Sequence, residues 1–561
     1  MEQLKISGLN FTYPGRDGKD LSDISLTVQK GDFILLFGRS GCGKSTFLKQ
    51  LKPAIAPYGR RSGRIEYDGT EITELSERDQ SSKIGFVSQN PENQIVTDKV
   101  WHELAFGLES LGYDNRTIRL RVAEMASFFG IQDWFLKPVN ELSGGQRQIL
   151  NLASVMVMQP EVLLLDEPTS QLDPIAVSGF LAMLRRINEE LGVTILLSEH
   201  HLEEVLPICS RVLFMEGGRL LLDVTPRELG SCMKRLKSEM TEALPACVKI
   251  YAAFSEGETP ITVREAKQWL STQISPAPKS PASPEDKPLF PRRNVQEPAV
   301  RLEEIWYRYE KKAEDIVKGV SMEIPQGCLY GIVGGNGVGK STLLSVIGGV
   351  NQPYRGKVKL MGVALPKIPN GERYRGLIGY LPQDPCSLFV RNTVGRDLED
   401  MAYAAFSDRQ TAQKRMERVI DFFHLKPLLG RHPYDLSGGE QQCAALAKVL
   451  LTDPRIILLD EPTKGIDAVF KKRLSKLFYT LKEQGKTVIL VSHDIDFCAH
   501  YMDFCALMFN GEIISENETR KFFMGNSFYT TAANRIARGI FPGGLTSEDV
   551  IEQCRKNRIG G

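Results

Sequence analysis

Two glycine-rich runs in the chain each end in a lysine and a serine, a combination that can hold a phosphate chain. They are Gly38-Arg-Ser-Gly-Cys-Gly43-Lys44-Ser45 and Gly334-Gly-Asn-Gly-Val-Gly339-Lys340-Ser341. Glycines let backbone N–H groups surround phosphates without a clash from Cβ, and a following helix adds partial positive charge at its N-terminus. We expect both lysines to reach the β- and γ-phosphates of a nucleotide and both serines to bind Mg²⁺. The residues expected at the nucleotide are Gly38, Ser40, Gly41, Gly43, Lys44, Ser45 and Thr46 in the first run, and Gly334, Asn336, Gly337, Gly339, Lys340, Ser341 and Thr342 in the second.

Two acidic pairs follow apolar runs and could supply the catalytic part of the same sites. Asp166-Glu167 follows Leu163-Leu164-Leu165, and Asp460-Glu461 follows Ile457-Leu458-Leu459. Apolar runs of this kind suit buried parallel strands, and ligands bind at the carboxyl edge of such a sheet. We expect each aspartate to hold the Mg²⁺ shell and each glutamate to polarise the attacking water as a general base.

The same motifs return in the second half of the chain, in the same order and at a nearly constant offset. A third pair, Leu142-Ser143-Gly144-Gly145-Gln146 and Leu436-Ser437-Gly438-Gly439-Glu440, stands at the same distance before each acidic pair. This repetition indicates duplication of a whole domain and not a short solenoid repeat. Apolar residues at 33–37 and 329–333 precede the glycine-rich runs, so each run has the strand, loop and helix context that phosphate binding requires.

The composition is that of ordinary globular protein. With 561 residues the chain is long enough for several domains, since one domain takes roughly 100–200 residues. Seventy basic residues face 69 acidic ones, which disfavours nucleic-acid binding through bulk charge. No stretch reaches the ~18 uninterrupted apolar residues of a membrane-spanning helix, and the first residues lack the pattern of a signal peptide. Ten scattered cysteines without a CxxC pair favour free thiols over disulfides or a zinc site.

A proline-rich segment separates the two halves. Seven prolines lie from Ser275 to Pro298, so we expect a semi-extended linker there. Each half also carries a small predicted helical extension, in which Thr262 or Thr546 would cap the last helix. The predicted domains are 1–242 and 299–525 for the two nucleotide-binding cores, 243–274 and 526–561 for the extensions, and 275–298 for the linker.

The Leu-Ser-Gly-Gly runs resemble the signature motif of ABC-type ATPases. The resemblance covers both halves and implies an α/β fold with two tandem P-loop domains. Each domain of this family has a mainly parallel sheet core, an antiparallel β subdomain and a helical subdomain that carries the signature. The signature of one domain faces the γ-phosphate of the ATP held by the other domain, so each ATP is sandwiched. The signature residues expected to contact ATP are Ser143, Gly144 and Gly145, and Ser437, Gly438 and Gly439.

The resemblance also assigns residues outside these runs. In the family, the Q-loop glutamine senses Mg²⁺ and the water, the switch histidine contacts the γ-phosphate, and an aromatic residue stacks on adenine. The matching residues are Gln89 and Gln383 in the Q-loop, His200 and His493 at the switch, Tyr13 and Tyr309 at adenine, and Asp173 and Asp467 in the D-loop. His201 stands beside His200, so the first switch assignment is open between two neighbours.

By this resemblance the motifs combine into two composite sites, each completed by the signature of the other half. Both sites keep the catalytic glutamate and the histidine, so we expect both to hydrolyse ATP. Two departures could slow or bias one site. Glu440 replaces the usual signature glutamine, and Lys464-Gly465-Ile466-Asp467 is an unusual D-loop.

The segment after Gln89 resembles the ATPase subunits of energy-coupling factor importers, including the cobalt-type ones. It reads Asn90-Pro91-Glu92-Asn93-Gln94-Ile95-Val96, and the segments 199–205 and 528–538 fit the same branch. The resemblance implies a peripheral protein at the cytoplasmic face of the membrane. It would work with a transmembrane coupling subunit and with a membrane subunit that binds the vitamin or transition-metal ion. The second half departs from the pattern at 384–388, so we expect the halves to dock unequal surfaces of the membrane partner.

The alternative is a soluble twin ATPase that acts on ribosomes or nucleic acid. Such proteins carry a charged helical linker, an iron–sulfur cysteine cluster or zinc modules. Here the linker is proline-rich, the first cysteine is Cys42, and no CxxC pair exists. A non-catalytic scaffold conflicts with two complete hydrolytic sets. We therefore expect no nucleic-acid partner, and we expect the two halves to pair within one chain.

Overall fold

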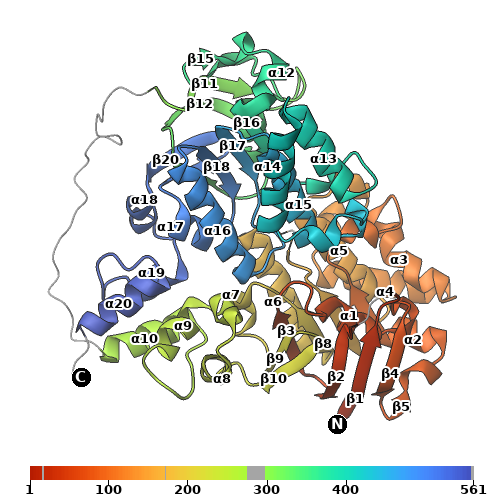
Figure 1. Ribbon diagram of the computed structural model, residues 1–561. Coiled ribbons are helices and arrows are strands. Elements are labelled where there is room, and N and C mark those ends of the chain that lie inside the picture. The colour runs from red at the N-terminus through yellow and green to blue at the C-terminus, as the bar shows by residue number, and fades with distance from the viewer. Residues whose placement is uncertain (16–17, 171, 274–296, 558–561) are drawn as a thin grey trace. The chain divides into compact units, whose positions relative to one another are not determined.

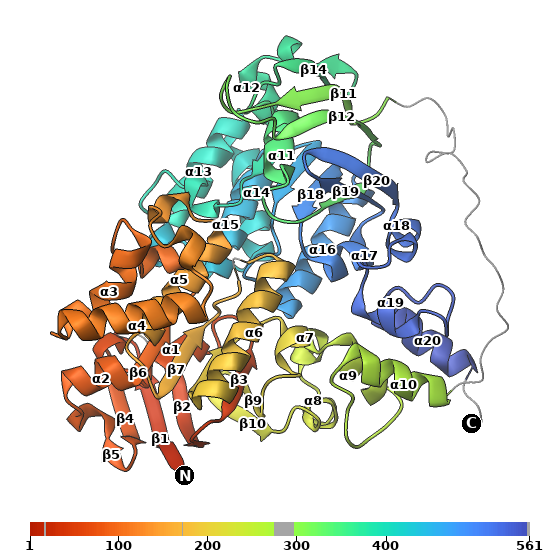
Figure 2. The same ribbon diagram turned by 180° about the vertical axis from the view of Figure 1, so that it is seen from behind.

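The computed structural model describes residues 1–15, 18–170, 172–273 and 297–557. These residues form two compact units: the first takes in Met1–Ala266, and the second takes in most of the chain from Lys267 onward. Each unit has the predicted α/β fold, with one mainly parallel sheet and one antiparallel sheet (Figure 1 and Figure 2). The predicted linker at 275–298 lies, up to residue 296, outside the described residues.

The core sheet of the first unit is parallel except at one edge. The strands of this unit are β1 (Glu2–Thr12), β2 (Leu21–Gln29), β3 (Phe33–Gly38), β4 (Arg60–Tyr67), β5 (Thr70–Glu71), β6 (Ile84–Val87), β7 (Val162–Asp166), β8 (Thr194–Ser198), β9 (Arg211–Glu216) and β10 (Arg219–Val224). The core sheet has the order β10-β9-β3-β8-β7-β6, in which β10 runs antiparallel to β9 and the other neighbours are parallel. The antiparallel sheet has the order β2-β1-β4-β5.

The two sheets of the first unit bury a continuous core between them. Strands β3, β7 and β8 are buried at every residue, which is why their sequences are nearly unbroken apolar runs. Ile34 and Leu36 of β3 and Leu164 of β7 belong to the same buried cluster as Ile6 and Phe11 of β1. The antiparallel sheet thereby fixes β3, and with it the glycine-rich loop that follows β3.

The helices of the first unit include a group that corresponds to the predicted signature subdomain. They are α1 (Lys44–Gln50), α2 (Glu77–Lys83), α3 (Val100–Ser110), α4 (Asn115–Phe128), α5 (Gly144–Met156), α6 (Pro174–Leu191), α7 (Leu202–Val205), α8 (Leu229–Leu236), α9 (Ala246–Ala252) and α10 (Val263–Gln273). Helices α3, α4 and α5 pack on one another, as the orange helices of Figure 2 show. The signature residues stand at the start of α5.

The second unit repeats this plan. Its strands are β11 (Val300–Tyr307), β12 (Val317–Ile324), β13 (Leu329–Val333), β14 (Arg355–Leu360), β15 (Val363–Ala364), β16 (Ile378–Leu381), β17 (Ile456–Asp460), β18 (Thr487–Ser492), β19 (Phe504–Phe509) and β20 (Glu512–Glu518). The core sheet has the order β16-β17-β18-β13-β19-β20 and is parallel except for the β19–β20 pair. The antiparallel sheet has the order β12-β11-β14-β15.

The helices of the second unit follow the same order along the chain. They are α11 (Lys340–Gly348), α12 (Asn370–Glu372), α13 (Val394–Ala405), α14 (Arg409–Phe422), α15 (Gly438–Leu451), α16 (Ala468–Glu483), α17 (Ile495–Tyr501), α18 (Thr519–Gly525), α19 (Ala532–Ala537) and α20 (Ser547–Asn557). Helices α13, α14 and α15 form the group that carries the second signature. Among the residues that the structure describes, no helix has both the length and the apolar character needed to cross a membrane.

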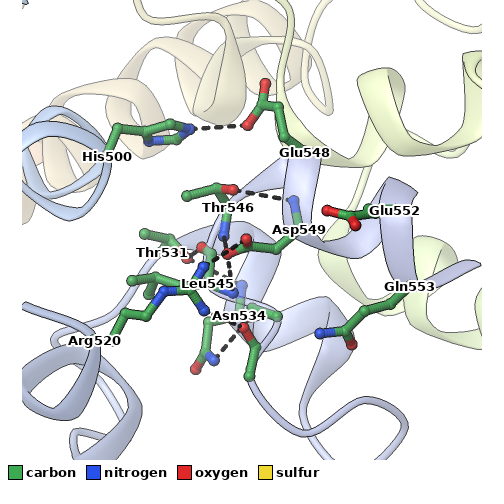
Figure 3. A network of polar contacts seen from close by, with 12 residues as sticks. His500, Arg520, Thr531, Asn534, Leu545, Thr546, Glu548, Asp549, Glu552 and Gln553 are labelled. Carbon is green, nitrogen blue, oxygen red and sulfur yellow. Dashed lines mark hydrogen bonds and ion pairs between the residues drawn. The ribbon is translucent and has the colours of Figure 1, made fainter.

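Both predicted extensions contain the expected N-cap residue. The N–H of Glu265 donates to Oγ1 of Thr262 at 3.2 Å, and the N–H of Asp549 donates to Oγ1 of Thr546 at 3.1 Å. In the second unit Asp549 returns the contact, since its carboxylate accepts the N–H of Thr546 at 3.0 Å (Figure 3). These bonds satisfy N–H groups that a helix leaves open at its start, and they confirm the predicted caps.

His500 of α17 joins the second extension to the core of its unit (Figure 3). Its Nε2 lies 3.1 Å from the carboxylate of Glu548 in α20, and its Nδ1 lies 2.8 Å from the carbonyl oxygen of Asp496. Burial lowers the pKa of His500, but Glu548 and Asp496 outweigh burial and raise this pKa above its ordinary value. Both ring nitrogens face acceptors, so the contact requires the imidazolium. Its stabilising effect is full below pH ~6.5 and is lost as the pH rises through the raised pKa.

In the first unit, Gln94 anchors the loop that follows the Q-loop residue. Its side-chain oxygen accepts the N–H of Ser88 at 2.9 Å and an amide N–H of Asn151 at 3.2 Å. Its side-chain nitrogen donates to the carbonyl oxygen of Phe86 at 2.8 Å. One neutral side chain inside the loop therefore links the end of β6, the loop backbone and helix α5.

The second unit anchors the same loop with a buried charge. Leu388 stands where the first unit has Gln94, and Lys448 of α15 donates to the carbonyl oxygen of Leu388 at 2.6 Å. The Lys448 ammonium also lies 2.6 Å from the carboxylate of Asp397, and these two side chains are only 7% and 2% exposed. Asp397 in turn accepts the N–H of Arg391 at 2.9 Å. The second half lacks the Asn-Pro-x-x-Gln pattern, and its Lys448–Asp397 pair anchors the loop that Gln94 anchors in the first half.

Replacing Lys448 with methionine should lower the free energy of unfolding of the second unit by about 3–5 kcal/mol, because Asp397 would keep a buried charge without its partner. Urea unfolding of the full chain, followed by circular dichroism, measures this loss. Lys426→Met is the matched control, because Lys426 forms an exposed ion pair with Asp421 at 2.8 Å. Equal shifts for the two variants would contradict the anchoring role of Lys448.

Candidate functional site

The two glycine-rich loops turn directly into helices, as predicted. Gly43 and Gly339 immediately precede α1 and α11 and have φ values of 107° and 101°, which side chains rarely tolerate. A Cβ at Gly38 would lie 2.1 Å from the carbonyl oxygen of Met215, so the start of the first loop also requires glycine. The predicted contacts at the loop tips, Ser40, Gly41, Asn336 and Gly337, are exposed and can meet a ligand.

Each loop lysine lies over the backbone of its own loop. Nζ of Lys44 donates to the carbonyl oxygen of Gly38 at 3.1 Å, and Nζ of Lys340 donates to that of Gly334 at 3.0 Å. Both side chains are buried, although each carries a charge. A buried ammonium beside a glycine-rich loop that leads into a helix suits an anion such as a phosphate chain.

A serine of each loop meets the aspartate at the end of the acid strand. The hydroxyl of Ser45 donates to Asp166 at 2.9 Å, and the hydroxyl of Ser341 donates to Asp460 at 3.0 Å. Burial raises the pKa of Asp166, and the charge of Glu167 adds to this effect. Burial also raises the pKa of Asp460, to about 6, against the hydrogen bond from Ser341.

These serine–aspartate pairs fit Mg²⁺. The ion prefers oxygen ligands and is commonly held by one or two carboxylates together with substrate phosphates and water. A cation beside Asp166 or Asp460 would favour the charged form that burial disfavours. Ser45, Asp166, Ser341 and Asp460 therefore have the chemistry of the predicted metal ligands.

Glu167 occupies a strained position at the centre of the first site. Its φ is 46°, in the left-handed region that residues other than glycine rarely adopt. Its carboxylate lies 2.8 Å from Nε2 of His200 and 3.5 Å from Nζ of Lys44, and it accepts an amide N–H of Gln89 at 3.2 Å. Burial raises the pKa of Glu167, but His200 and Lys44 outweigh burial and hold it at about 2. The predicted glutamate, histidine, lysine and glutamine of this site are therefore brought together.

Glu461 has the same backbone conformation in the second unit but different partners. Its φ is 51°, and its carboxylate lies 2.9 Å from Nδ1 of His493. The same carboxylate accepts the backbone N–H of His493 at 3.3 Å. Gln383 is exposed, and in the described part of the chain no hydrogen bond joins it to Glu461. The second site thus brings its glutamate and histidine together, whereas its predicted Q-loop residue makes no hydrogen bond to Glu461 in the described part of the chain.

The contact with Glu167 is made by His200 and not by its neighbour. His201 is exposed and directly precedes α7. The residue before His200 is Glu199, which the sequence motifs did not single out and which is buried with a 2% exposed side chain. It accepts the backbone N–H of His200 at 3.1 Å and that of Thr169 at 3.2 Å, and it also accepts the hydroxyl of Thr169.

The signature residues begin helices α5 and α15 in the same way. Ser143 forms a capping box with Gln146, and Ser437 forms a capping box with Glu440. Glu440 accepts the N–H of Ser437 at 2.8 Å, as Gln146 accepts that of Ser143 at 2.9 Å. The glutamate in the second signature therefore preserves the cap, and Gly144, Gly145, Gly438 and Gly439 occupy the first turns of the two helices.

The two predicted adenine-stacking tyrosines are held next to the loop helices. The hydroxyl of Tyr13 lies 3.1 Å from that of Thr46, and the hydroxyl of Tyr309 lies 3.1 Å from that of Thr342. Each tyrosine thus stands beside its phosphate loop.

The D-loop aspartates lie at helix starts. Asp173 accepts the N–H of Ala176 at 2.8 Å and caps α6, and the buried Asp467 immediately precedes α16. Lys464 belongs to the unusual second D-loop. Burial lowers the pKa of Lys464, and the nearby charges of Glu461 and Asp460 oppose this effect without cancelling it.

Comparisons with known proteins match both units. The family model described as ABC transporter matches residues 21–170 and 317–464. A protein of Bacillus cereus named as an ABC transporter ATP-binding protein is 43% identical over 555 residues, which cover 99% of this chain and 98% of that protein. A protein of Methanosarcina mazei with the same name is 33% identical over 528 residues, which cover 92% of this chain and 89% of that protein.

One similar solved structure is titled CbiO1 from Clostridium perfringens, part of the ABC transporter complex CbiONQ. It is 32% identical, covers 42% of this chain and 94% of its own, and has a TM-score of 0.38. The family matches coincide with the two nucleotide-binding cores described above. The chain therefore belongs to the ABC transporter ATP-binding proteins and is an ATPase with two fused ABC domains.

Proposed function

We propose that this ATPase powers an importer of the energy-coupling factor type for a vitamin or a transition-metal ion. The proposal starts from the hydrolytic cluster, in which a glutamate faces a histidine in both units; the side chain of Glu167 is 13% exposed and that of Glu461 is 5% exposed. The importer type is supported by the resemblance of the segment Asn90–Val96 to that branch and by the loop anchors that hold this segment and its counterpart.

In the proposed reaction, Glu167 and Glu461 are the general bases. The oxygen of a water molecule forms a bond to the γ-phosphorus, and its proton passes to the glutamate carboxylate. The bond between the γ-phosphorus and the bridging oxygen breaks, and ADP leaves. His200 and His493 contact the γ-phosphate, while Lys44 and its counterpart Lys340 neutralise phosphate charge. Mg²⁺, when bound by the serine–aspartate pairs, would neutralise further negative charge on the phosphates.

We also propose that the two units pair within one chain, so that the signature of each unit completes the site of the other. The capped helix starts at Ser143 and Ser437 support this role, because helix N-termini attract anions. Tyr13 and Tyr309 would stack on the adenine of the nucleotide held by their own unit.

Docking to a transmembrane coupling subunit is supported by an apolar side chain that each unit presents beside its Q-loop segment. Val96 is 69% exposed and Val390 is 80% exposed. The backbone N–H of each valine is fixed by a buried carboxylate, that of Glu103 in the first unit and that of Asp397 in the second. Apolar side chains held outward in this way suit an apolar partner surface. We propose a peripheral position at the cytoplasmic face of the membrane and a separate membrane subunit that binds the transported substrate.

Replacing both general bases, as Glu167→Gln with Glu461→Gln, should lower ATP hydrolysis by about 10²–10⁴-fold while ATP still binds. Phosphate release and equilibrium binding of a fluorescent ATP analogue measure the two properties. Glu189→Gln is the control, since Glu189 forms an exposed helical pair with Arg185. Full hydrolysis by the double variant would remove the glutamates from the proposed reaction.

Pairing within one chain predicts that two lysine variants, each with one defective phosphate loop, do not complement each other. A Lys44→Ala chain mixed with a Lys340→Ala chain should show only the mean activity of the two variants measured alone. Pairing between chains would instead combine intact loops from different molecules. Restoration of normal ATP hydrolysis on mixing would therefore overturn the proposal.

The importer assignment predicts which proteins accompany the tagged chain when it is purified from detergent-solubilised native membranes. Mass spectrometry should identify a transmembrane coupling subunit together with a small, very apolar membrane subunit. Replacing the exposed valines, as Val96→Asp with Val390→Asp, should reduce their recovery at least tenfold without loss of ATP binding. Recovery of ribosomal proteins or nucleic acid, and no membrane protein, would contradict the importer assignment.

A further inference from the structure

We propose that Glu199 is a positioning residue of the first ATP site and that it makes this site hydrolyse ATP faster than the second. The inference rests on the proposed roles of Glu167 and Glu461 as general bases. It concerns a buried carboxyl group that lies behind the hydrolytic cluster and does not reach the phosphates itself.

The contacts of Glu199 join two segments that must keep a fixed distance. One of its oxygens accepts the N–H of His200 at 3.1 Å, and the other accepts the N–H of Thr169 at 3.2 Å together with the Thr169 hydroxyl. Thr169 lies two residues after Glu167, the proposed general base, and His200 is the proposed switch histidine. The carboxyl group of Glu199 therefore connects the general-base segment, residues 167–169, to the switch segment at His200. Three donors from two segments converge on this one buried carboxyl group, which ties the two segments together.

The backbone N–H of His200 donates to Glu199 and not to Glu167. The carboxylate of Glu167 can therefore contact side chains that face the nucleotide. These are the Nε2 of His200 at 2.8 Å, the Nζ of Lys44 at 3.5 Å and the amide of Gln89 at 3.2 Å. A side-chain donor can move away when a water molecule or a phosphate arrives. The first general base is therefore surrounded by partners that it can exchange.

The second unit has a different residue at the equivalent position. The N–H of Glu167 donates to the carbonyl oxygen of Ser198, and the N–H of Glu461 donates to that of Val491, so Glu199 corresponds to Ser492. The Ser492 hydroxyl lies 3.3 Å from that of Thr463 and accepts the N–H of Asp494 at 3.0 Å. It does not replace the carboxylate as an acceptor for the switch histidine.

Glu461 accepts the backbone N–H of His493 in place of the missing carboxylate. One of its oxygens receives both this N–H, at 3.3 Å, and the Nδ1 contact of the same residue, at 2.9 Å. A backbone donor cannot rotate away as a side-chain donor can, so it keeps this oxygen of Glu461 directed at the backbone of His493. The second general base is thus held by the switch segment, which disfavours proton transfer to it.

The test isolates each site with one glutamine substitution. A Glu461→Gln chain reports hydrolysis at the first site, and a Glu167→Gln chain reports hydrolysis at the second. The first chain is expected to have the larger kcat, by about tenfold. Equal kcat values, or a faster Glu167→Gln chain, would overturn the inference.

Glu199→Ser in the Glu461→Gln chain then gives the first site the residue of the second. We expect kcat to fall about tenfold while KM changes less than twofold, because Glu199 orients the base and does not touch ATP. The isosteric Glu199→Gln keeps one acceptor oxygen and should fall between the two values. It also serves as the decisive variant if the serine variant does not fold.

Glu516→Gln in the same background is the matched control, since Glu516 is a half-buried carboxyl that accepts the hydroxyl of Tyr330 at 2.5 Å away from the cluster. It should change neither kcat nor KM. Loss of thermal stability in the Glu199 variants without a fall in kcat per folded molecule would reduce Glu199 to a structural role. Hydrolysis by the Glu167→Gln, Glu461→Gln double variant would overturn the proposed bases themselves, which distinguishes the two failures.

Discussion

A hydrogen bond between a serine hydroxyl and a buried aspartate joins the phosphate loop to the acid strand in each unit. The partners are Ser45 and Asp166 in the first unit and Ser341 and Asp460 in the second. The parallel sheet brings the ends of these strands to one edge, and the left-handed backbone of the next residue turns the glutamate toward the histidine. The proposed phosphate loop, metal ligands and general base all depend on this one meeting point.

Both halves keep the serine–aspartate hydrogen bond, but different side chains hold the segments around it. The first unit holds its switch segment with Glu199 and its Q-loop segment with Gln94, whereas the second uses Glu461 itself and the Lys448–Asp397 pair. The residue types of the proposed glutamate, histidine, lysine and glutamine are the same in the two halves, but their contacts with one another and with the side chains behind them differ. Two sites with the same reactive groups can therefore differ in how freely those groups move.

Local signals predicted the strands, loops and caps, because glycine loops, apolar runs and capping residues act over a few neighbouring positions. The serine and the aspartate were each predicted at the metal, the first from the loop motif and the second from its place at a strand end. Their direct hydrogen bond appears in the structure, where β8 or β18 lies between the loop strand and the acid strand. Glu199 and Lys448 could not be found in this way. A glutamate beside histidines and a lysine within a helix both read as solvated side chains, and their burial depends on segments 30 to 60 residues away. Gln383 matches its motif, but among the described residues it makes no hydrogen bond to Glu461, because a motif does not fix the conformation of the loop that carries it.

The loop anchors also limit how the two halves can exchange parts. Gln94 lies within the loop of the first unit, whereas Lys448 reaches the loop of the second unit from helix α15. A loop transplanted from the second half into the first would arrive without Lys448, and helix α15 transplanted alone would leave behind Asp397, the partner of its buried ammonium. The anchor of the second half therefore depends on three segments, the loop itself, helix α13 with Asp397 and helix α15 with Lys448, and none of them keeps its role when it is exchanged alone.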